Sequence, residues 1–128
     1  MNKNLINEQI GAAYEAIKSV GISKVGVMVE KAFRGQISSF GAAITMGSTE
    51  AAVAFFSDDG SAAVKRSKLI EAIVEIIEKR DPKLQNIEAK NSNMRLLQYA
   101  GKYGTEAKEN ILNAAIAIKL AMNLFELK

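Results

Sequence analysis

Apolar side chains recur at the three- and four-residue spacing of an α-helix along almost the whole chain, and this periodicity constrains the fold most. The 128 residues include one proline, Pro82, so few positions forbid a helix. Glycines mostly separate the periodic stretches, and no stretch shows the alternating β-branched pattern of a strand. The sequence therefore predicts an all-α fold, a compact single-domain bundle of about five to six helices over residues 1–128.

Six helical stretches follow from the periodicity. Each has an apolar stripe on one face, and residues that end helices separate them. Gly21 ends the first stretch, Gly47 ends the second and the Asp81-Pro82 pair ends the fourth. Ser23 has the side chain of an N-cap and marks the start of the second. The expected helices cover residues 4–20, 23–46, 48–56, 61–80, 91–103 and 105–127.

The second and the last of these stretches have features of their own. Gly35 and Gly41 lie inside the second, and a glycine in a helix interior costs roughly 1 kcal/mol relative to alanine. We therefore expect a kink, a break or a close backbone approach near them. The last stretch is apolar on nearly every face, which is typical of a central helix or of one that a partner covers.

The residue types that most enzymes and metal sites need are missing. The sequence contains no His, Cys or Trp, which excludes serine-histidine and cysteine-histidine nucleophiles, thiolate and imidazole metal ligands, and disulfides. No glycine-rich phosphate-binding motif occurs either. We therefore expect no catalytic residue, no metal site and no cofactor.

Two groups of acidic residues remain as candidates for a carboxylate site. Asp58 and Asp59 lie in a turn that ends in glycine, and a hard-cation site needs more converging oxygens than this pair supplies. Glu71, Glu75 and Glu78 share one face of the fourth predicted helix, but no second helix offers a matching Glu-x-x-His. We interpret both groups as solvated surface. An enzyme that uses only Glu and Lys, with Glu71 or Glu75 as its acid, is the third alternative for function.

The sequence also bears on location. Without cysteine the chain gives no sign of an oxidising compartment. Its first residues lack the uninterrupted apolar segment of a signal peptide, and no stretch approaches the roughly 18 apolar residues that span a bilayer. We expect a cytoplasmic protein that has no contact with a membrane.

The basic residues form two local clusters, of which the first is a band on the second predicted helix. The chain has 17 basic and 14 acidic residues and a formal net charge of +3, which favours anionic partners. At about 100° per residue, Lys24, Lys31 and Arg34 fall on one face together with Ser38, and Glu30 is rotated toward the far edge. A basic band without an acid suits a phosphate backbone.

The second cluster is Lys65, Arg66 and Lys68, in the early part of the fourth predicted helix. Cations are mildly unfavourable there against the helix dipole, which hints at an external anion. Neither cluster has interleaved aromatic residues for base stacking, so nucleic-acid contacts are expected to the backbone and to depend weakly on base sequence. The alternative for both clusters is an ordinary solvated surface.

Four segments of the chain resemble a known family, and the similarity extends over about residues 6–127. The segments are packing and surface patterns rather than catalytic signatures. They are FRGQISSFG at 33–41, AAVAFFS at 51–57, RSKL at 66–69 and NAAIAIKLAM at 113–122. Together they resemble the small helical subunit of the type III-B CRISPR effector, the Cmr complex.

This resemblance implies a non-catalytic protein whose copies stack as a minor filament inside an RNA-guided antiviral ribonucleoprotein. The filament lines the channel in which target RNA pairs with the guide. The implied partners are the other Cmr subunits, including the backbone subunits, further copies of the chain, and the backbone of guide RNA and target RNA. The polar positions that would meet RNA or a neighbouring subunit are Arg34, Gln36, Ser38, Arg66 and Lys68.

Taken together, the basic clusters and the resemblance predict one set of RNA-binding residues. Phe55 and Phe56 are assigned instead to the core or to the seam between copies. A helical protein-interaction adaptor without a nucleic-acid role is the alternative function, and salt dependence separates the two because phosphate contacts weaken steeply with salt. The predicted RNA-binding residues are Lys24, Lys31, Arg34, Gln36, Ser38, Lys65, Arg66 and Lys68.

Overall fold

The computed structural model of the chain describes residues 2–25 and 27–128. Within these residues there are six α-helices and a sheet of three two-residue strands, which confirms the all-α fold class. The helices are α1 (Lys3–Ser19), α2 (Lys31–Met46), α3 (Thr49–Phe56), α4 (Ser67–Glu78), α5 (Pro82–Gln85) and α6 (Ser92–Ala121).

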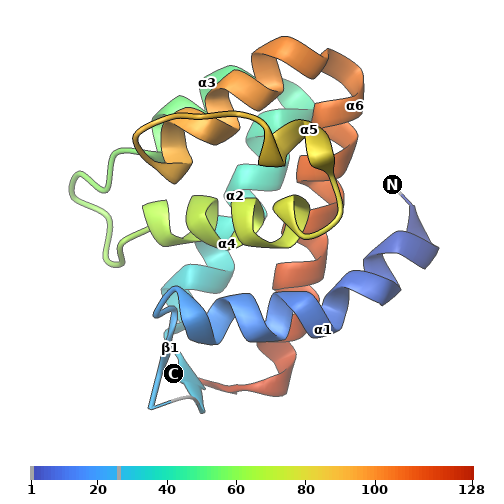
Figure 1. Cartoon of the computed structure of the whole chain (residues 1–128). Coiled ribbons are helices and arrows are strands. Elements are labelled where there is room, and N and C mark those ends of the chain that lie inside the picture. Colours follow the sequence, from blue (N-terminus) through green and yellow to red (C-terminus); the bar gives the residue numbers. More distant parts are fainter. Residues whose placement is uncertain (1, 26) are drawn as a thin grey trace.

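Helix α6 is the centre of the core. It packs against α1, α2, α3 and α4, and Figure 1 shows α1 and α4 lying roughly side by side as they cross it. Small side chains on α6, among them Ala107, Ala114 and Ala117, are fully buried and let the neighbouring helices come close. The prediction that the last apolar stretch forms a central helix is therefore confirmed. None of the helices in residues 2–25 and 27–128 has the length and apolarity needed to cross a bilayer.

The segment expected to begin the second helix forms a small sheet instead. Strand β1 (Ser23–Lys24) pairs antiparallel with β2 (Met28–Val29), and β3 (Glu126–Leu127) pairs parallel with β2 from the other end of the chain. Helix α2 begins only at Lys31. Both the predicted helix start at Ser23 and the expectation that the chain has no strand are wrong.

Long-range hydrogen bonds explain the change from helix to strand. The amides of Glu126 and Lys128 each donate to carbonyls of the hairpin, at Val27 and Val29, over 2.9 Å. Val25, between β1 and β2, has a φ of 55°, which a β-branched residue rarely adopts and which ends any helix there. The chain leaves α6 through a 3₁₀ turn at Met122–Leu124, so the last predicted helix also ends earlier than expected.

The fourth helix is shorter than predicted because a loop residue caps it. Asp59 accepts hydrogen bonds from the backbone amide and the hydroxyl of Ser67, at 2.9 and 3.1 Å. These bonds fix the helix start at Ser67 instead of Ser61, and residues 57–66 form a loop that projects from the bundle in Figure 1. Beyond the C-terminal end of α4, Asp81 is the N-cap of the short helix α5, and its side chain accepts a hydrogen bond from the amide of Lys83 at 3.0 Å.

The glycine that bends a helix is Gly104 in α6 and not Gly35 or Gly41 in α2. The two helices predicted on either side of Gly104 are one helix, α6, with a kink at this residue, where φ is 52° and ψ is −121°. Gly35 and Gly41 continue α2 as ordinary helical residues, and a Cβ at either position would meet nothing within 4 Å. The kink or close approach predicted at Gly35 and Gly41 is therefore wrong.

Buried hydrogen bonds around Tyr99 hold the two halves of α6 together across the kink. The Tyr99 hydroxyl donates to Asp81 Oδ2 over 2.6 Å and accepts from Asn110 Nδ2 over 2.8 Å. Tyr99 precedes Gly104 and Asn110 follows it, while Asp81 lies just beyond α4. Burial of the ring, and then the hydrogen bond to Asp81, raise the pKa of Tyr99 well above its usual value of 10.0, so this hydroxyl stays neutral in the folded protein.

Exchange of glycine for alanine tests the kink. Gly104→Ala is expected to lower the free energy of unfolding by about 1–3 kcal/mol, because a side chain is strained at its positive φ. Gly101→Ala, in the same helix with open space around the new Cβ, is expected to raise it by up to about 1 kcal/mol. Urea denaturation followed by circular dichroism measures both, and equal effects of the two variants would contradict the kink.

The pH dependence of stability tests the Tyr99 environment. Because the pKa is higher in the folded chain than in the unfolded one, the stabilisation is complete below about pH 10 and is lost as the pH rises above it. We expect the free energy of unfolding to fall as the pH rises above about 10. The Tyr99→Phe variant should be less stable at neutral pH but show a shallower fall over this range. The same slope in both proteins would mean that Tyr99 titrates normally.

Candidate functional site

Three lysines from two separate segments of the chain line one hollow on the surface. Lys24 comes from β1, Lys65 from the loop before α4 and Lys68 from the first turn of α4. The hollow has a volume of about 220 Å³, and Glu30 is the one acid among its lining residues. We call this site the lysine hollow. Its remaining lining residues are Gly21, Ile22, Phe33, Ala63 and Val64.

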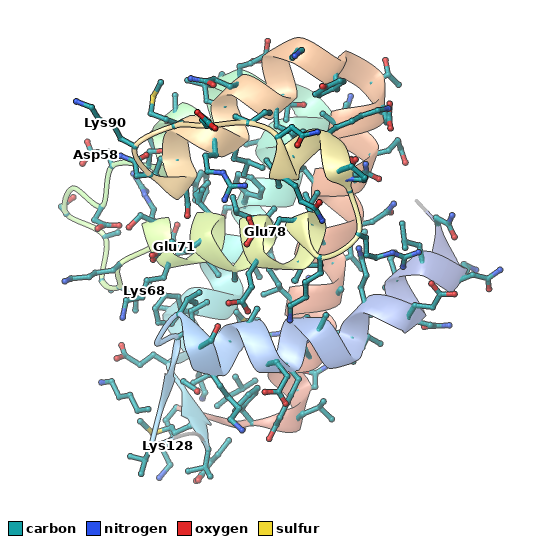
Figure 2. The ribbon with its side chains drawn as sticks, in the orientation of Figure 1. Asp58, Lys68, Glu71, Glu78, Lys90 and Lys128 are labelled. Carbon is teal, nitrogen blue, oxygen red and sulfur yellow. The ribbon has the colours of Figure 1, made fainter. Side chains whose placement is uncertain are left out.

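The backbone at the end of α1 positions Lys68. Gly21 has a φ of 83°, which glycine adopts readily, and its carbonyl accepts a hydrogen bond from Lys68 Nζ at 3.0 Å. In Figure 2, Lys68 lies at the first turn of α4 on the side that faces α1. This contact holds the ammonium group at the edge of the hollow and leaves two of its three donors for another ligand.

Glu30 reduces the positive charge of the hollow without cancelling it. Its Oε1 atom is 2.6 Å from Lys24 Nζ, and both side chains are partly exposed. Three lysines and one glutamate leave a formal charge of +2 among the lining residues. Helix α2 begins at this rim without a side-chain cap, and the positive end of its dipole adds to the attraction for an anion, whereas the start of α4 is already capped by the Asp59 carboxylate.

The acid-free band predicted on the second helix does not exist. Lys24 lies on a strand rather than on α2, and Glu30, which was placed at the far edge of the band, pairs with it. The second predicted cluster also changes, because Lys65 and Arg66 precede α4 and only Lys68 lies on it. The fold instead brings together one lysine of the first cluster and two lysines of the second.

The other predicted residues of α2 lie outside the lysine hollow. Lys31 is exposed at the first position of the helix, and Arg34 and Gln36 are half-buried. The Ser38 hydroxyl donates a hydrogen bond to the Arg34 carbonyl at 3.1 Å. Ser38 also lines a different groove, between α2 and α6. These four residues therefore do not form one site with Lys24, Lys65 and Lys68.

Arg66 holds the loop before α4 against the end of α3. Its guanidinium carbon lies 4.3 Å from the centre of the Phe55 ring and 5.2 Å from that of Phe56. It also donates to the carbonyls of Asp58 at 2.8 Å and Phe55 at 3.2 Å. Phe56 is buried in the core as expected, whereas Phe55 remains 61% exposed beneath Arg66. This structural role of Arg66 was not evident from the spacing of the charges.

The acidic groups are more engaged with their neighbours than the interpretation as solvated surface implied. Besides the cap that Asp59 forms, Asp58 accepts from the amide of Gly60 at 2.9 Å. Glu75 accepts from the Ser19 hydroxyl at 2.6 Å, and Glu78 forms an ion pair with Arg95 at 2.7 Å. Glu71 is exposed (Figure 2). The part of the chain that the structure describes contains no group of three or more metal-binding side chains.

A second hollow was not anticipated from the sequence. It has a volume of about 210 Å³ and lies where α1, the end of α4 and α6 meet. The residues of this hollow come from three distant segments, and in the sequence each segment shows only the pattern of an ordinary helix surface. No local pattern could therefore have identified the hollow. We call it the acceptor-rich hollow, and its lining residues are Leu5, Gln9, Ile77, Arg80, Asp81, Glu106 and Asn110.

Neighbouring cations in the loop should respond differently to truncation. Arg66→Ala removes the contact with Phe55 and two hydrogen bonds, so we expect the free energy of unfolding to fall by about 1–2 kcal/mol. Lys65→Ala, at an exposed position in the hollow, is expected to change it by less than about 0.5 kcal/mol. Urea denaturation gives both values. An equal loss of unfolding free energy in the two variants would show that the contacts of Arg66 do not stabilise the loop.

Charged side chains from distant segments line both the lysine hollow and the acceptor-rich hollow. No protein-family model matches this sequence, and no curated protein and no solved structure matches it either. Function is therefore inferred from the geometry and charge of these sites, together with the resemblance of the four sequence segments.

Proposed function

We propose that the chain is a non-catalytic subunit of a ribonucleoprotein and that it holds RNA by its phosphate backbone at the lysine hollow. The observation that carries the proposal is that the fold brings Lys24 to Lys65 and Lys68, more than forty residues away in the chain, at one site. Ammonium groups are donors without acceptors, and phosphate oxygens are their natural partners.

The shape of the hollow favours a phosphate over a base. Its volume of about 220 Å³ corresponds to roughly seven water molecules, which is room for a phosphate group with part of its hydration shell. Phe33 is the aromatic residue among its lining residues, and it is buried in the core rather than presented for stacking. Contacts at this site would therefore depend weakly on base sequence.

The ion pair between Lys24 and Glu30 does not close the site to RNA. The side chains are 60% and 35% exposed, and exposed pairs of this kind contribute at most about 1 kcal/mol. A phosphate carries a full charge and can compete for the same ammonium group. The negative charge of Glu30 lowers the affinity of the hollow for a single phosphate. A modest affinity at each site suits a subunit that makes one of many contacts along an RNA chain.

The resemblance of the four segments makes the proposal more specific. We propose that the ribonucleoprotein is a type III-B CRISPR effector and that this chain is its small subunit in the minor filament, acting in antiviral defence in the cytoplasm. The proposed partners are the other Cmr subunits including the backbone subunits, further copies of this chain, and guide RNA with target RNA. The polar residues of the first segment, which lie apart from the lysine hollow, are then available for a second contact with RNA or a neighbour.

A protein-interaction adaptor is the second candidate, and exposed apolar side chains favour it. Met46 is 88% exposed, Leu124 is 63% exposed and Phe55 is 61% exposed. Large apolar side chains on a surface often mark protein contacts. The same residues suit the seam between subunits, so RNA binding, with its salt dependence, and the presence of RNA in the native assembly separate the two functions.

Charge removal at the hollow tests RNA binding. Changing Lys24, Lys65 and Lys68 together to Gln is expected to weaken binding of a labelled single-stranded RNA at least tenfold in low salt. Because the variant removes three cations from the hollow, the slope of log affinity against log salt should become shallower, by about 2 at most. The matched control changes Lys3, Lys79 and Lys90, which are exposed and lie outside the hollow, and keeps most of the affinity. Fluorescence anisotropy measures both, and equal losses would reject the hollow as the site.

Purification from the native source tests the assembly. The tagged wild-type chain and the triple Lys→Gln variant are recovered in low salt, and their partners are identified by mass spectrometry and by sequencing of bound RNA. Several CRISPR-associated subunits with short guide RNAs on the wild-type chain would support the proposal. A single protein partner without RNA would replace it with the adaptor.

A further inference from the structure

A buried side-chain oxygen without a hydrogen-bond partner lies at the acceptor-rich hollow. Gln9, on the buried face of α1, is 6% exposed, and its Oε1 atom accepts no hydrogen bond in the described part of the chain. An unsatisfied buried acceptor costs about 1–3 kcal/mol, so its retention calls for a physical reason. The Gln9 side chain lines the hollow, but Oε1 itself has almost no accessible surface. A half-turn of the terminal amide, whose torsion is soft, would exchange Oε1 with the amide nitrogen and bring the oxygen to the interior.

The charged residues around the hollow favour a cation as its occupant. Among the lining residues, Asp81 and Glu106 are acids and Arg80 is the one base, which leaves a formal charge of −1. Arg80 is already engaged by Glu8 at 2.9 Å. Because Glu8 already balances the charge of Arg80, Arg80 does not neutralise Asp81 or Glu106.

The neighbouring cation, Lys83, leaves acceptor capacity in the hollow. It binds Glu106 through both carboxylate oxygens, at 2.6 and 2.7 Å, and this hydrogen bonding raises the pKa of Lys83 above its usual value of 10.5. Each carboxylate oxygen of Glu106 retains a further lone pair, as does Asp81 Oδ1, which accepts from the Lys83 amide. Asp81 Oδ2 already accepts from Tyr99 at 2.6 Å and from Asn110 at 3.5 Å. The hollow thus offers acceptors from Gln9, Asp81 and Glu106.

The walls of the hollow fit an aliphatic stem. Leu5 from α1 and Ile77 from α4 line it beside the polar groups. A ligand that buries CH₂ groups against these side chains and ends in several N–H donors would match both parts of the lining. A divalent metal ion fits less well, because hard cations take six to eight oxygen ligands and prefer several carboxylates.

We propose that the acceptor-rich hollow binds a primary ammonium group carried on a flexible aliphatic stem. The ammonium donates to Gln9 Oε1 and to the carboxylates of Asp81 and Glu106, while the stem lies against Leu5 and Ile77. Two sources supply this chemistry, a free aliphatic di- or polyamine and the side chain of a lysine on a docked protein. The proposal is independent of RNA binding at the lysine hollow.

Titration of the isotope-labelled full chain with n-butylammonium tests the proposal. We expect saturable NMR shifts of the Gln9 and Asn110 side-chain amides. The matched probe n-butyltrimethylammonium has the same charge and stem but no N–H donor, and it should bind at least tenfold more weakly. Absence of a Gln9 shift with n-butylammonium, or equal binding of the two probes, would overturn the proposal.

Variants separate the site from general charge effects. Gln9→Leu is expected to weaken n-butylammonium binding at least tenfold while raising the melting temperature, because it removes the unpartnered acceptor. Glu106→Gln should weaken binding several-fold. Glu50→Gln, an equal charge change at an exposed position of α3 outside the hollow, should leave it unchanged. Unaltered binding in Gln9→Leu, or equal losses in the two glutamate variants, would refute the assignment.

Two further ligands identify the source of the ammonium group. Tighter binding of 1,4-diaminobutane than of Nα-acetyl-lysine-methylamide would indicate a free amine. The reverse order would indicate a lysine of a docked protein, and equal affinities would mean that the hollow recognises the ammonium head and stem alone. Failure of both ligands to displace n-butylammonium would contradict the proposal.

Discussion

The buried hydrogen bonds of Tyr99 are the interaction on which the rest of the structure depends. The hydroxyl joins Asp81, which caps α5, to Asn110 in the second half of α6. Because Gly104 interrupts α6 between Tyr99 and Asn110, these bonds set the direction in which the helix continues. That direction in turn determines how α1 and α4 pack on α6, and Asp81 and Asn110 also line the acceptor-rich hollow.

Most helix positions were predictable from the sequence, and the two wrong helix starts, at Ser23 and at Ser61, share one physical cause. Local periodicity records which face of a segment is buried, and α1, α3 and α6 lie close to where it placed them. Strand β1 at Ser23 pairs with β2, and β2 is held in turn by β3, about a hundred residues away in the chain. The start of α4 depends on Asp59 in the preceding loop. Such partners compete with local propensity, and periodicity has no information about them.

The lysine hollow shows that predicting a functional site from local sequence spacing has the same limit. The clusters predicted along the sequence assumed that Lys24, Lys31 and Arg34 share one helix. The hairpin separates Lys24 from the others and carries it to Lys65 and Lys68, while Arg66, adjacent in the sequence, turns toward Phe55. The residue types were therefore identified correctly as basic surface, but their grouping depends on tertiary contacts that no spacing rule contains.

Helix α4 relates the two hollows to each other. Its twelve residues span roughly 18 Å, with Lys68 of the lysine hollow in the first turn and Ile77 of the acceptor-rich hollow in the last. The aligned peptide dipoles make the first turn positive and the last turn negative. A cation at the acceptor-rich hollow therefore meets the favourable end of α4, whereas at the lysine hollow the Asp59 carboxylate already balances the positive end. Because exposed dipole effects are screened within the terminal turn, the charge of the lysine hollow comes from its three lysines and not from α4.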